Sequence, residues 1–258
     1  YHYFRGISIL LLPIVIVLLI FTIAQGTTID GAYASRCIRI PVLNVSFQSS
    51  TLASVVLMVY VARYLSKITE KKVTFKETII PLWAPVFAVL VLILPANFST
   101  TAIIFVMTLI LMFLGGYPIK YLSAIVGVGI VMLGIFVLTA KAFPGLLPNR
   151  IDTWSSRLET FFDGEEADEQ YQVEKAKIAI AQGGITGTGI GKSVQRNFLP
   201  QSSSDFIYAI IVEEMGLIGA FGVMLAYLLL LFRIVIVATK ASSIFGKLVV
   251  MGVGLPIV

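Results

Sequence analysis

The chain has 258 residues, of which 58% are hydrophobic and 13% are charged, and its mean hydropathy is +0.96. A soluble globular domain carries about 25% charged residues, so this composition excludes an ordinary soluble protein. It indicates an all-α polytopic membrane protein. The net charge of +5 would suggest nucleic-acid binding in a soluble protein. In a membrane protein it reports topology instead, and we expect no nucleic-acid partner.

Apolar runs of about 20 residues can cross the ~30 Å hydrocarbon core as helices. The sequence contains six such runs, at residues 7–24, 51–66, 79–95, 99–115, 122–142 and 206–232. A seventh starts near residue 246 and reaches Val258 in mid-span, while the chain opens on Tyr1 rather than Met. We therefore expect both ends to be truncated, with at least one helix missing. Residues 1–258 are expected to form one partial integral membrane domain.

The distribution of cations predicts the orientation, because Lys and Arg concentrate in short cytoplasmic loops. If the N-terminal end is cytoplasmic, the inner segments hold ten cations against two acids. The short outer loops then hold only Arg36 and Arg39, and the remaining cations lie in or directly before the long segment 143–205. Long loops escape the rule, so we expect 143–205 to be extracytoplasmic. The single cysteine, Cys37, cannot form an intrachain disulfide and is uninformative about the compartment.

Polar segments connect the apolar runs. Residues 25–50 form a polar outer excursion, and Asn, Pro and Gly predict tight turns at 95–100 and 115–118. In the long loop, residues 151–162 have the apolar spacing of an amphipathic helix on the membrane surface. Residues 174–182 have helical composition, and the acidic run 164–169 is expected to be a solvated turn.

The run GTGIGKS at 187–193 resembles a phosphate-binding P-loop. That motif requires glycine at position 186, where the chain has Thr186, and an extracytoplasmic loop would not meet a cytosolic nucleotide. Two interpretations stay open. The run is a flexible connector, or its backbone N–H groups bind a phosphate or pyrophosphate beside Lys192 and Arg196.

Asp205 stands where the long polar loop enters the apolar run 206–232. It could simply cap the N-terminus of that helix. Alternatively, a carboxylate at the edge of a low-dielectric region holds a proton more readily, which suits a general base near neutral pH. A lipid-linked substrate would present its head group at this depth. Both interpretations stay open on these residues alone.

Four further charges are candidates for binding. Glu213 and Glu214 lie two turns into the run 206–232, where charge is costly and usually faces a cavity or a partner. At least one is expected to face the protein interior, in a helix–helix ion pair or hydrogen bond or on a substrate. Arg36 and Arg39 would share one face of a helical turn and bind an anion or lipid head groups. No His, Cys and Asp cluster has metal-site spacing.

The segment NFLPQSSSDFIYAIIVEEMGLIG at 197–219 resembles the signature of the SEDS family (shape, elongation, division and sporulation), roughly LPE-x-x-x-DF-I-x-A-x-I-x-EE-x-G-x-x-G. GAYASRCIRIPVLNVSFQSSTLAS at 31–54 is similar to that family's G-A-x-R-W-I … F-Q-P-S-E-x-x-K segment. PANFST stands where the family has P-D-x-G-T, and RIDTWSSRLETFF and GKSVQR follow in the family's order. The likeness covers essentially the whole chain and is stronger to the division member than to the elongation member.

The resemblance implies a ten-helix fold, of which six complete spans and part of a seventh would be present. It implies a peptidoglycan glycosyltransferase of the bacterial inner membrane that polymerises lipid II during cell division. Partners would be lipid II, a class B penicillin-binding protein and other division membrane proteins. No cofactor is certain, although a divalent cation could help to neutralise the leaving pyrophosphate. A lipid II flippase and a non-catalytic division scaffold remain alternatives.

By resemblance, Asp205 is the essential outer-loop Asp, Arg36 falls on the Arg of R-W-I, and Glu213 and Glu214 fall on the EE pair. The other candidate substrate-binding residues are the outer cations, which could meet charge developing on the pyrophosphate, and one polar residue beside the base: Arg150, Lys192, Arg196 and Gln201. Several residues depart from the family pattern: Cys37, Ser49, Thr51, Ser54, Asn97 and Gln201. Since expected charges are missing, Asp205 becomes more nearly the sole titrating candidate, and a weakened enzyme is a further alternative.

Overall fold

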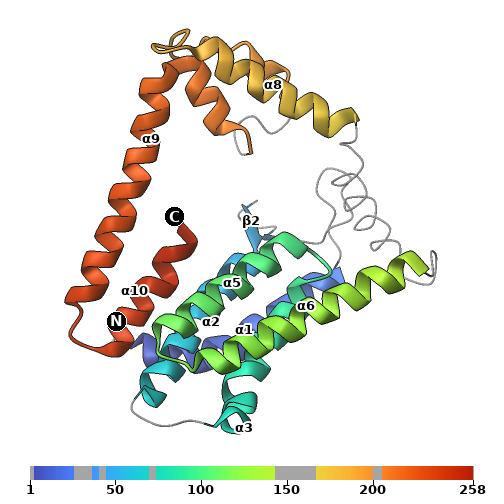
Figure 1. The fold of residues 1–258 in the computed structure, drawn as a ribbon, viewed down its shortest axis with the longest axis vertical. Coiled ribbons are helices and arrows are strands. Elements are labelled where there is room, and N and C mark those ends of the chain that lie inside the picture. Colours follow the sequence, from blue (N-terminus) through green and yellow to red (C-terminus); the bar gives the residue numbers. More distant parts are fainter. Residues whose placement is uncertain are drawn as a thin grey trace. The chain divides into compact units, whose positions relative to one another are not determined.

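The computed structural model describes residues 3–25, 37–40, 45–69, 74–142, 167–199 and 205–257. Helices dominate these residues (Figure 1). The chain forms two compact units, one of Tyr1–Met132 with Leu231–Val258 and the other of Leu133–Leu230. They are described in turn. The single domain expected for residues 1–258 stays a prediction.

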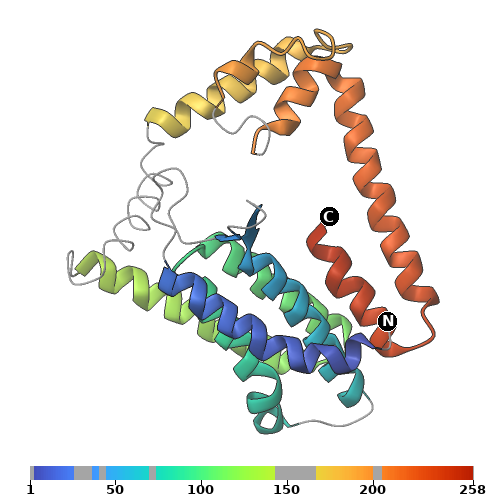
Figure 2. The same ribbon diagram turned by 180° about the vertical axis from the view of Figure 1, so that it is seen from behind.

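The first unit is a bundle of apolar helices around α2 (Ser49–Ile68). This helix contacts α1 (Phe4–Gln25), α4 (Ala84–Ile93), α5 (Phe98–Leu114) and α10 (Ile244–Gly254), and Figure 2 shows α1 and α2 side by side. Leu57, Val61 and Leu65 of α2 are completely buried. Membrane helices associate through such close packing, for which small residues leave room. Gly252 of α10 illustrates this, because a Cβ there would lie 2.9 Å from Leu111 and 3.3 Å from Met58.

The third apolar run is a continuous helical stretch with one widened turn. It comprises α3 (Phe75–Thr78), the π-helix η1 (Ile79–Trp83) and α4. Pro81 lies in the widened turn and has no N–H to donate, and the Tyr60 hydroxyl donates to its carbonyl oxygen at 2.6 Å. Beside it, the buried Tyr117 hydroxyl lies 2.8 Å from Thr78 Oγ1 and accepts from Trp83 Nε1 at 3.2 Å. The polar side chains of Thr78, Trp83 and Tyr117 are therefore paired with one another.

All seven predicted apolar runs coincide with helices, including α6 (Ile119–Ala142) and α9 (Ile207–Lys240). Four stretches of the described residues are long and apolar enough to cross a membrane: Phe4–Ala24, Ser49–Ile68, Phe75–Ile93 and Ile207–Lys240. Shorter apolar helices lie at Phe98–Leu114, Ile119–Val131 and Ile244–Ile257, the last including the 3-10 turn η3 (Leu255–Ile257). The all-α multi-pass class is confirmed, and the number of spans stays a prediction.

Both predicted turns are confirmed. Asn97 ends the first one by capping α5, its Oδ1 accepting from Thr100 N at 3.1 Å, and Gly116 takes a φ of 75° in the second. The outer excursion contains an antiparallel pair, β1 (Cys37–Ile40) and β2 (Val45–Gln48). Arg39 thus lies on a strand opposite Ser46. Arg39 is therefore not on a helical turn, because the β-branched residues of this segment favour extended backbone; Arg36 lies outside the described residues.

The second unit contains α8 (Ala167–Gly183), the 3-10 turn η2 (Gln195–Asn197) and most of α9. The helix predicted at 174–182 is confirmed and begins earlier. Acidic residues 168 and 169 therefore belong to its first turn rather than to a solvated loop, and acidic side chains are favourable at that end of a helix. The amphipathic helix predicted at 151–162 lies outside the described residues.

Candidate functional site

Helix α9 is broken at Gly216, whose φ of 66° and ψ of −164° are non-helical. Figure 1 shows the resulting sharp bend, next to the end of α8. The part after the break, residues 217–240, would be about 36 Å long at 1.5 Å per residue, which exceeds the ~30 Å hydrocarbon core. The predicted span 206–232 is therefore not one straight helix. Its first section, residues 207–215, is a separate short segment that follows Asp205 and has Glu213 near its end.

The glycine-rich loop after α8 completes the backbone hydrogen bonding at this break. Thr188 N and Gly189 N donate to the carbonyl oxygens of Glu213 and Glu214 at 2.9 and 3.0 Å. In the opposite direction, the amides of Leu217 and Ile218 donate to the loop, reaching Gly184 O at 3.0 Å and Ile185 O at 3.4 Å. Backbone N–H and C=O groups that a break leaves without helical partners require such partners elsewhere in the protein. The interpretation of this run as a flexible connector is therefore wrong.

Glycine is required where the loop meets α9. A Cβ on Gly183 or Gly187 would lie closer than 3.0 Å to the backbone of Val212 or Glu214, and Gly187 also has a φ of 80°. A Cβ on Gly216 would in turn meet the loop backbone at Ile185 and Gly187. The glycines thus permit two backbones to approach closely, and all three have this same structural role.

The carboxylate of Glu213 is the anion that the loop binds. Glu213 is 1% exposed. Its Oε2 accepts from Ser193 Oγ at 2.5 Å, and its Oε1 accepts from Val194 N at 3.0 Å and from Gln195 N at 3.4 Å. Successive backbone N–H groups make an anion-binding concavity, and here two of them, just after the glycine-rich run, bind an internal carboxylate. Phosphate binding by the run itself stays a prediction.

This clamp consists of Glu213, Ser193, Val194 and Gln195, and it fixes the segment that carries two predicted cations. Lys192 and Arg196 flank the clamp, and both side chains are exposed. Arg196 N donates to Ser193 Oγ at 3.1 Å, so the Ser193 hydroxyl links the Arg196 backbone to the Glu213 carboxylate. The two cationic side chains are left available for a ligand.

Asp205 precedes α9 by two positions and is exposed. Phe206 O accepts from Ile210 N at 3.2 Å, so Phe206 occupies the capping position and the prediction that Asp205 caps the helix is wrong. Within the described parts of the chain, no hydrogen bond reaches the Asp205 carboxylate. The described residues thus leave this carboxylate exposed.

Of the remaining predicted site residues, the structure describes Glu214. Arg36, Arg150 and Gln201 lie outside the described residues. Glu214 is partly buried, and its carbonyl oxygen, rather than its side chain, binds the loop. Sequence reasoning missed Ser193, which directly follows the Gly-Lys pair, and Gln195, two positions further on.

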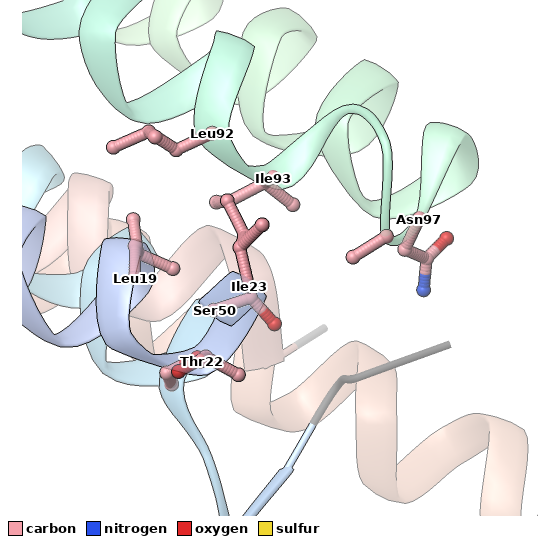
Figure 3. A pocket seen from close by; sticks show the side chains of 9 residues that line it. Leu19, Thr22, Ile23, Ser50, Leu92, Ile93 and Asn97 are labelled. Atoms are coloured by element: carbon pink, nitrogen blue, oxygen red, sulfur yellow. The ribbon is translucent and has the colours of Figure 1, made fainter. Parts of the chain in front are cut away.

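A separate small pocket lies in the first unit, between the C-terminal ends of α1 and α4 and the N-terminal end of α2. Figure 3 shows Leu19, Thr22 and Ile23 of α1 facing Leu92 and Ile93 of α4. Its volume of about 20 Å³ is enough for one water molecule. The lining also includes Ser49, Ser50, Ala96 and Asn97, and it contains no charged residue. The pocket offers hydroxyl groups but no acid or base.

A divalent cation would need a set of carboxylate, imidazole or thiolate ligands. Within the described ranges, no three His, Cys, Asp or Glu residues gather as a metal site. A divalent cation that is held partly by the pyrophosphate of a substrate needs only one or two carboxylates, so this cation stays a prediction.

The family model described as "Cell cycle protein", for FtsW, RodA and SpoVE, matches residues 1–258. A protein of Marinomonas mediterranea named "Probable peptidoglycan glycosyltransferase FtsW" is 31% identical over 241 residues, covering 92% of this chain and 55% of that protein. A protein of the same name from Geobacter sp. is 30% identical over 264 residues, covering 99% of this chain and 67% of that protein. The chain thus spans roughly half to two thirds of the length of these relatives.

Solved structures show the same fold. A chain from a structure described as "Structural coordination of polymerization and crosslinking by a peptidoglycan synthase complex" has a TM-score of 0.71 at 21% identity, covering 99% of this chain and 68% of that chain. The rod shape determining protein RodA of Thermus thermophilus has a TM-score of 0.60 at 17% identity, covering 98% of this chain and 63% of RodA.

Proposed function

Because the chain belongs to the FtsW, RodA and SpoVE family, we propose that it is a peptidoglycan glycosyltransferase that polymerises lipid II during cell division. Relatives named as probable peptidoglycan glycosyltransferases support this activity. The observation that carries the residue assignment is the exposed Asp205 carboxylate, which has no hydrogen-bond partner in the described chain. It precedes the helical segment to which the loop bearing Lys192 and Arg196 is bound.

In the proposed reaction, Asp205 is the general base. Its carboxylate accepts the proton of the acceptor sugar's 4-hydroxyl group, whose oxygen forms a bond to the anomeric carbon of the donor. The bond from that carbon to the undecaprenyl pyrophosphate breaks, and the pyrophosphate oxygen keeps the electron pair. A base positioned for this transfer contributes about 10²–10⁴-fold to the rate.

Charge that develops on the leaving pyrophosphate needs donors that are already in place. Lys192 and Arg196 suit this task because the clamp fixes the backbone between them while both side chains stay exposed. Arg36 and Arg150 are proposed for the same role from the sequence. Gln201 and Glu214 are proposed only as neighbours of the substrate.

The proposed setting is the bacterial inner membrane, with the N-terminal end cytoplasmic and residues 143–205 extracytoplasmic. The cation distribution and the need to meet a lipid-linked sugar outside support this orientation. A class B penicillin-binding protein is the proposed partner. A solved structure with the same fold belongs to a peptidoglycan synthase complex that coordinates polymerisation with crosslinking, and this supports a crosslinking partner. Other division membrane proteins would join it.

Strand synthesis from purified lipid II by the full-length protein in liposomes tests the activity and the base together. Asp205→Asn keeps the shape of the side chain and removes its basicity, so we expect strand synthesis to fall about 10²–10⁴-fold. Glu174→Gln, which removes an exposed carboxylate from α8, is the matched control and should polymerise normally. Normal synthesis by Asp205→Asn would overturn the base assignment, and no synthesis by the wild type would overturn the activity.

A lipid II flippase is the second candidate, and the break at Gly216 is the observation that favours it, since broken helices are typical of transporter sites. It ranks second because loop residues 184–189 already bind the backbone groups near the break, so these groups are not presented to a substrate. Movement of labelled lipid II across liposomes without elongation would reverse this order.

A further inference from the structure

We propose that Glu213 is a positioning residue for the glycosyl transfer. Its buried carboxylate holds the segment Lys192–Arg196 against the helical section that follows Asp205, and so sets where the cations stand relative to the base. The catalytic consequence rests on the proposed function. The clamp itself does not, because it is a set of contacts that can be measured without turnover.

The first argument is the strength of the clamp. Hydrogen bonds to an ionised acceptor are roughly twice as strong as neutral ones, and Glu213 accepts from one hydroxyl and two backbone amides. A carboxylate that is 1% exposed would be very unfavourable without such donors. Loop and helix therefore depend on each other, since the loop supplies the donors and the helix supplies the charge.

The second argument is that few contacts other than the clamp hold the segment between Lys192 and Arg196. Gln195 is 6% exposed, and its side-chain Oε1 has no hydrogen-bond partner, which opposes burial of this turn. In the described residues Lys192 and Arg196 form no ion pair. The other attachments of the loop lie outside this segment: Thr188 N and Gly189 N donate to carbonyl oxygens of α9 before it, and the Phe198 ring lies 5.1 Å from Lys175 Nζ after it. The clamp is therefore the attachment that lies closest to Arg196.

The third argument is the geometry along the short helical section. Asp205 precedes this section and Glu213 is near its end, before the break at Gly216. Between them lie about two turns of helix, which act as a rigid spacer. Because the loop is attached at the Glu213 end, a shift of the loop changes the distance from Arg196 to Asp205. Displacements of about 1 Å can cost on the order of 100-fold in rate.

The clamp is tested first without catalysis, by hydrogen exchange of the full-length protein in detergent. In Glu213→Gln we expect the amides of Val194 and Gln195 to exchange at least about tenfold faster, whereas Glu174→Gln should leave them unchanged. Ser193→Ala keeps the charge and removes one donor, so it should move the same amides by a smaller factor. If Glu213→Gln does not fold, Ser193→Ala is the variant that tests the clamp. Unchanged exchange in both clamp variants would overturn the proposal.

The catalytic consequence is tested by a double-mutant cycle on lipid II polymerisation. Glu213→Gln, or Ser193→Ala in its place, should lower kcat/KM about 10- to 100-fold in the wild-type background. The loss should be several-fold smaller when Arg196 is already Ala, because the clamp acts through that side chain. Equal losses in both backgrounds would overturn the positioning role. If the wild type does not polymerise lipid II, the proposed function fails, while the exchange result still decides the clamp.

Discussion

Replacement of Gly216 by alanine tests the joint between the loop and α9. With the loop in place, alanine would have to adopt a φ of 66° and a ψ of −164°, a region essentially limited to glycine that costs about 1–3 kcal/mol. Its Cβ would also lie closer than 3.0 Å to the backbone of Ile185 and Gly187. The strain alone therefore approaches about 3 kcal/mol.

The alternative is that α9 straightens and the loop leaves. The four backbone hydrogen bonds from Thr188, Gly189, Leu217 and Ile218 would then be lost, at about 1 kcal/mol each. This cost is reduced by about 1 kcal/mol, because alanine is more favourable than glycine in a regular helix. The net cost is again about 3 kcal/mol, so either route predicts the same destabilisation.

Gly222→Ala is the matched control, because Gly222 lies on the same helix with open space around its Cβ. It should stabilise α9 by about 0.5–1 kcal/mol. The two variants should therefore differ by about 4 kcal/mol in the free energy of unfolding, measured by denaturant titration of the detergent-solubilised protein. Equal stability of Gly216→Ala and Gly222→Ala would refute the assignment of the break and the loop as one joint.

Two further substitutions test pairs of polar groups in the first unit. Tyr117→Phe removes the hydroxyl that lies against Thr78 and accepts from Trp83, so it should cost about 1–3 kcal/mol of unfolding free energy. Tyr121→Phe, at a partly exposed ring, should stay within about 0.5 kcal/mol; equal effects would contradict the pairing. Asn97→Ala removes the cap of α5 and should cost about 1 kcal/mol, whereas Asn97→Asp should keep the stability within a few tenths. Thermal unfolding in detergent measures both, and an unaltered Asn97→Ala midpoint would contradict the cap.

Sequence reasoning recovered the helices because the bilayer leaves a chain few alternatives. Runs of apolar residues must satisfy their backbone within helices, so the seven predicted runs and the described helices coincide. The turns at Asn97 and Gly116 were predictable for a local reason, since each depends on residues that are adjacent in the chain. The π-helical turn around Pro81 was not predictable, because it depends on packing between helices.

The site was predictable only in part. The Thr188 and Gly189 N–H groups of the glycine-rich run bind backbone carbonyl oxygens. The residues just after the run bind the Glu213 carboxylate instead, from 18 to 20 residues further along the chain. No periodicity or motif specifies that pairing. The place of Asp205 before the cap of α9 was also undetermined, because a helix start is uncertain by one or two positions in any sequence interpretation.

The clamp has a consequence for how the protein assembles. Its contacts join residues only 18 to 20 positions apart, and the entropic cost of closing such a loop is modest and grows slowly with length. Segments with local contacts form quickly. The glycine loop is synthesised before α9, so it is available to receive the Ile207–Met215 section as soon as that section emerges. This part of the molecule can therefore close during synthesis, ahead of the longer-range packing of α10 against α2.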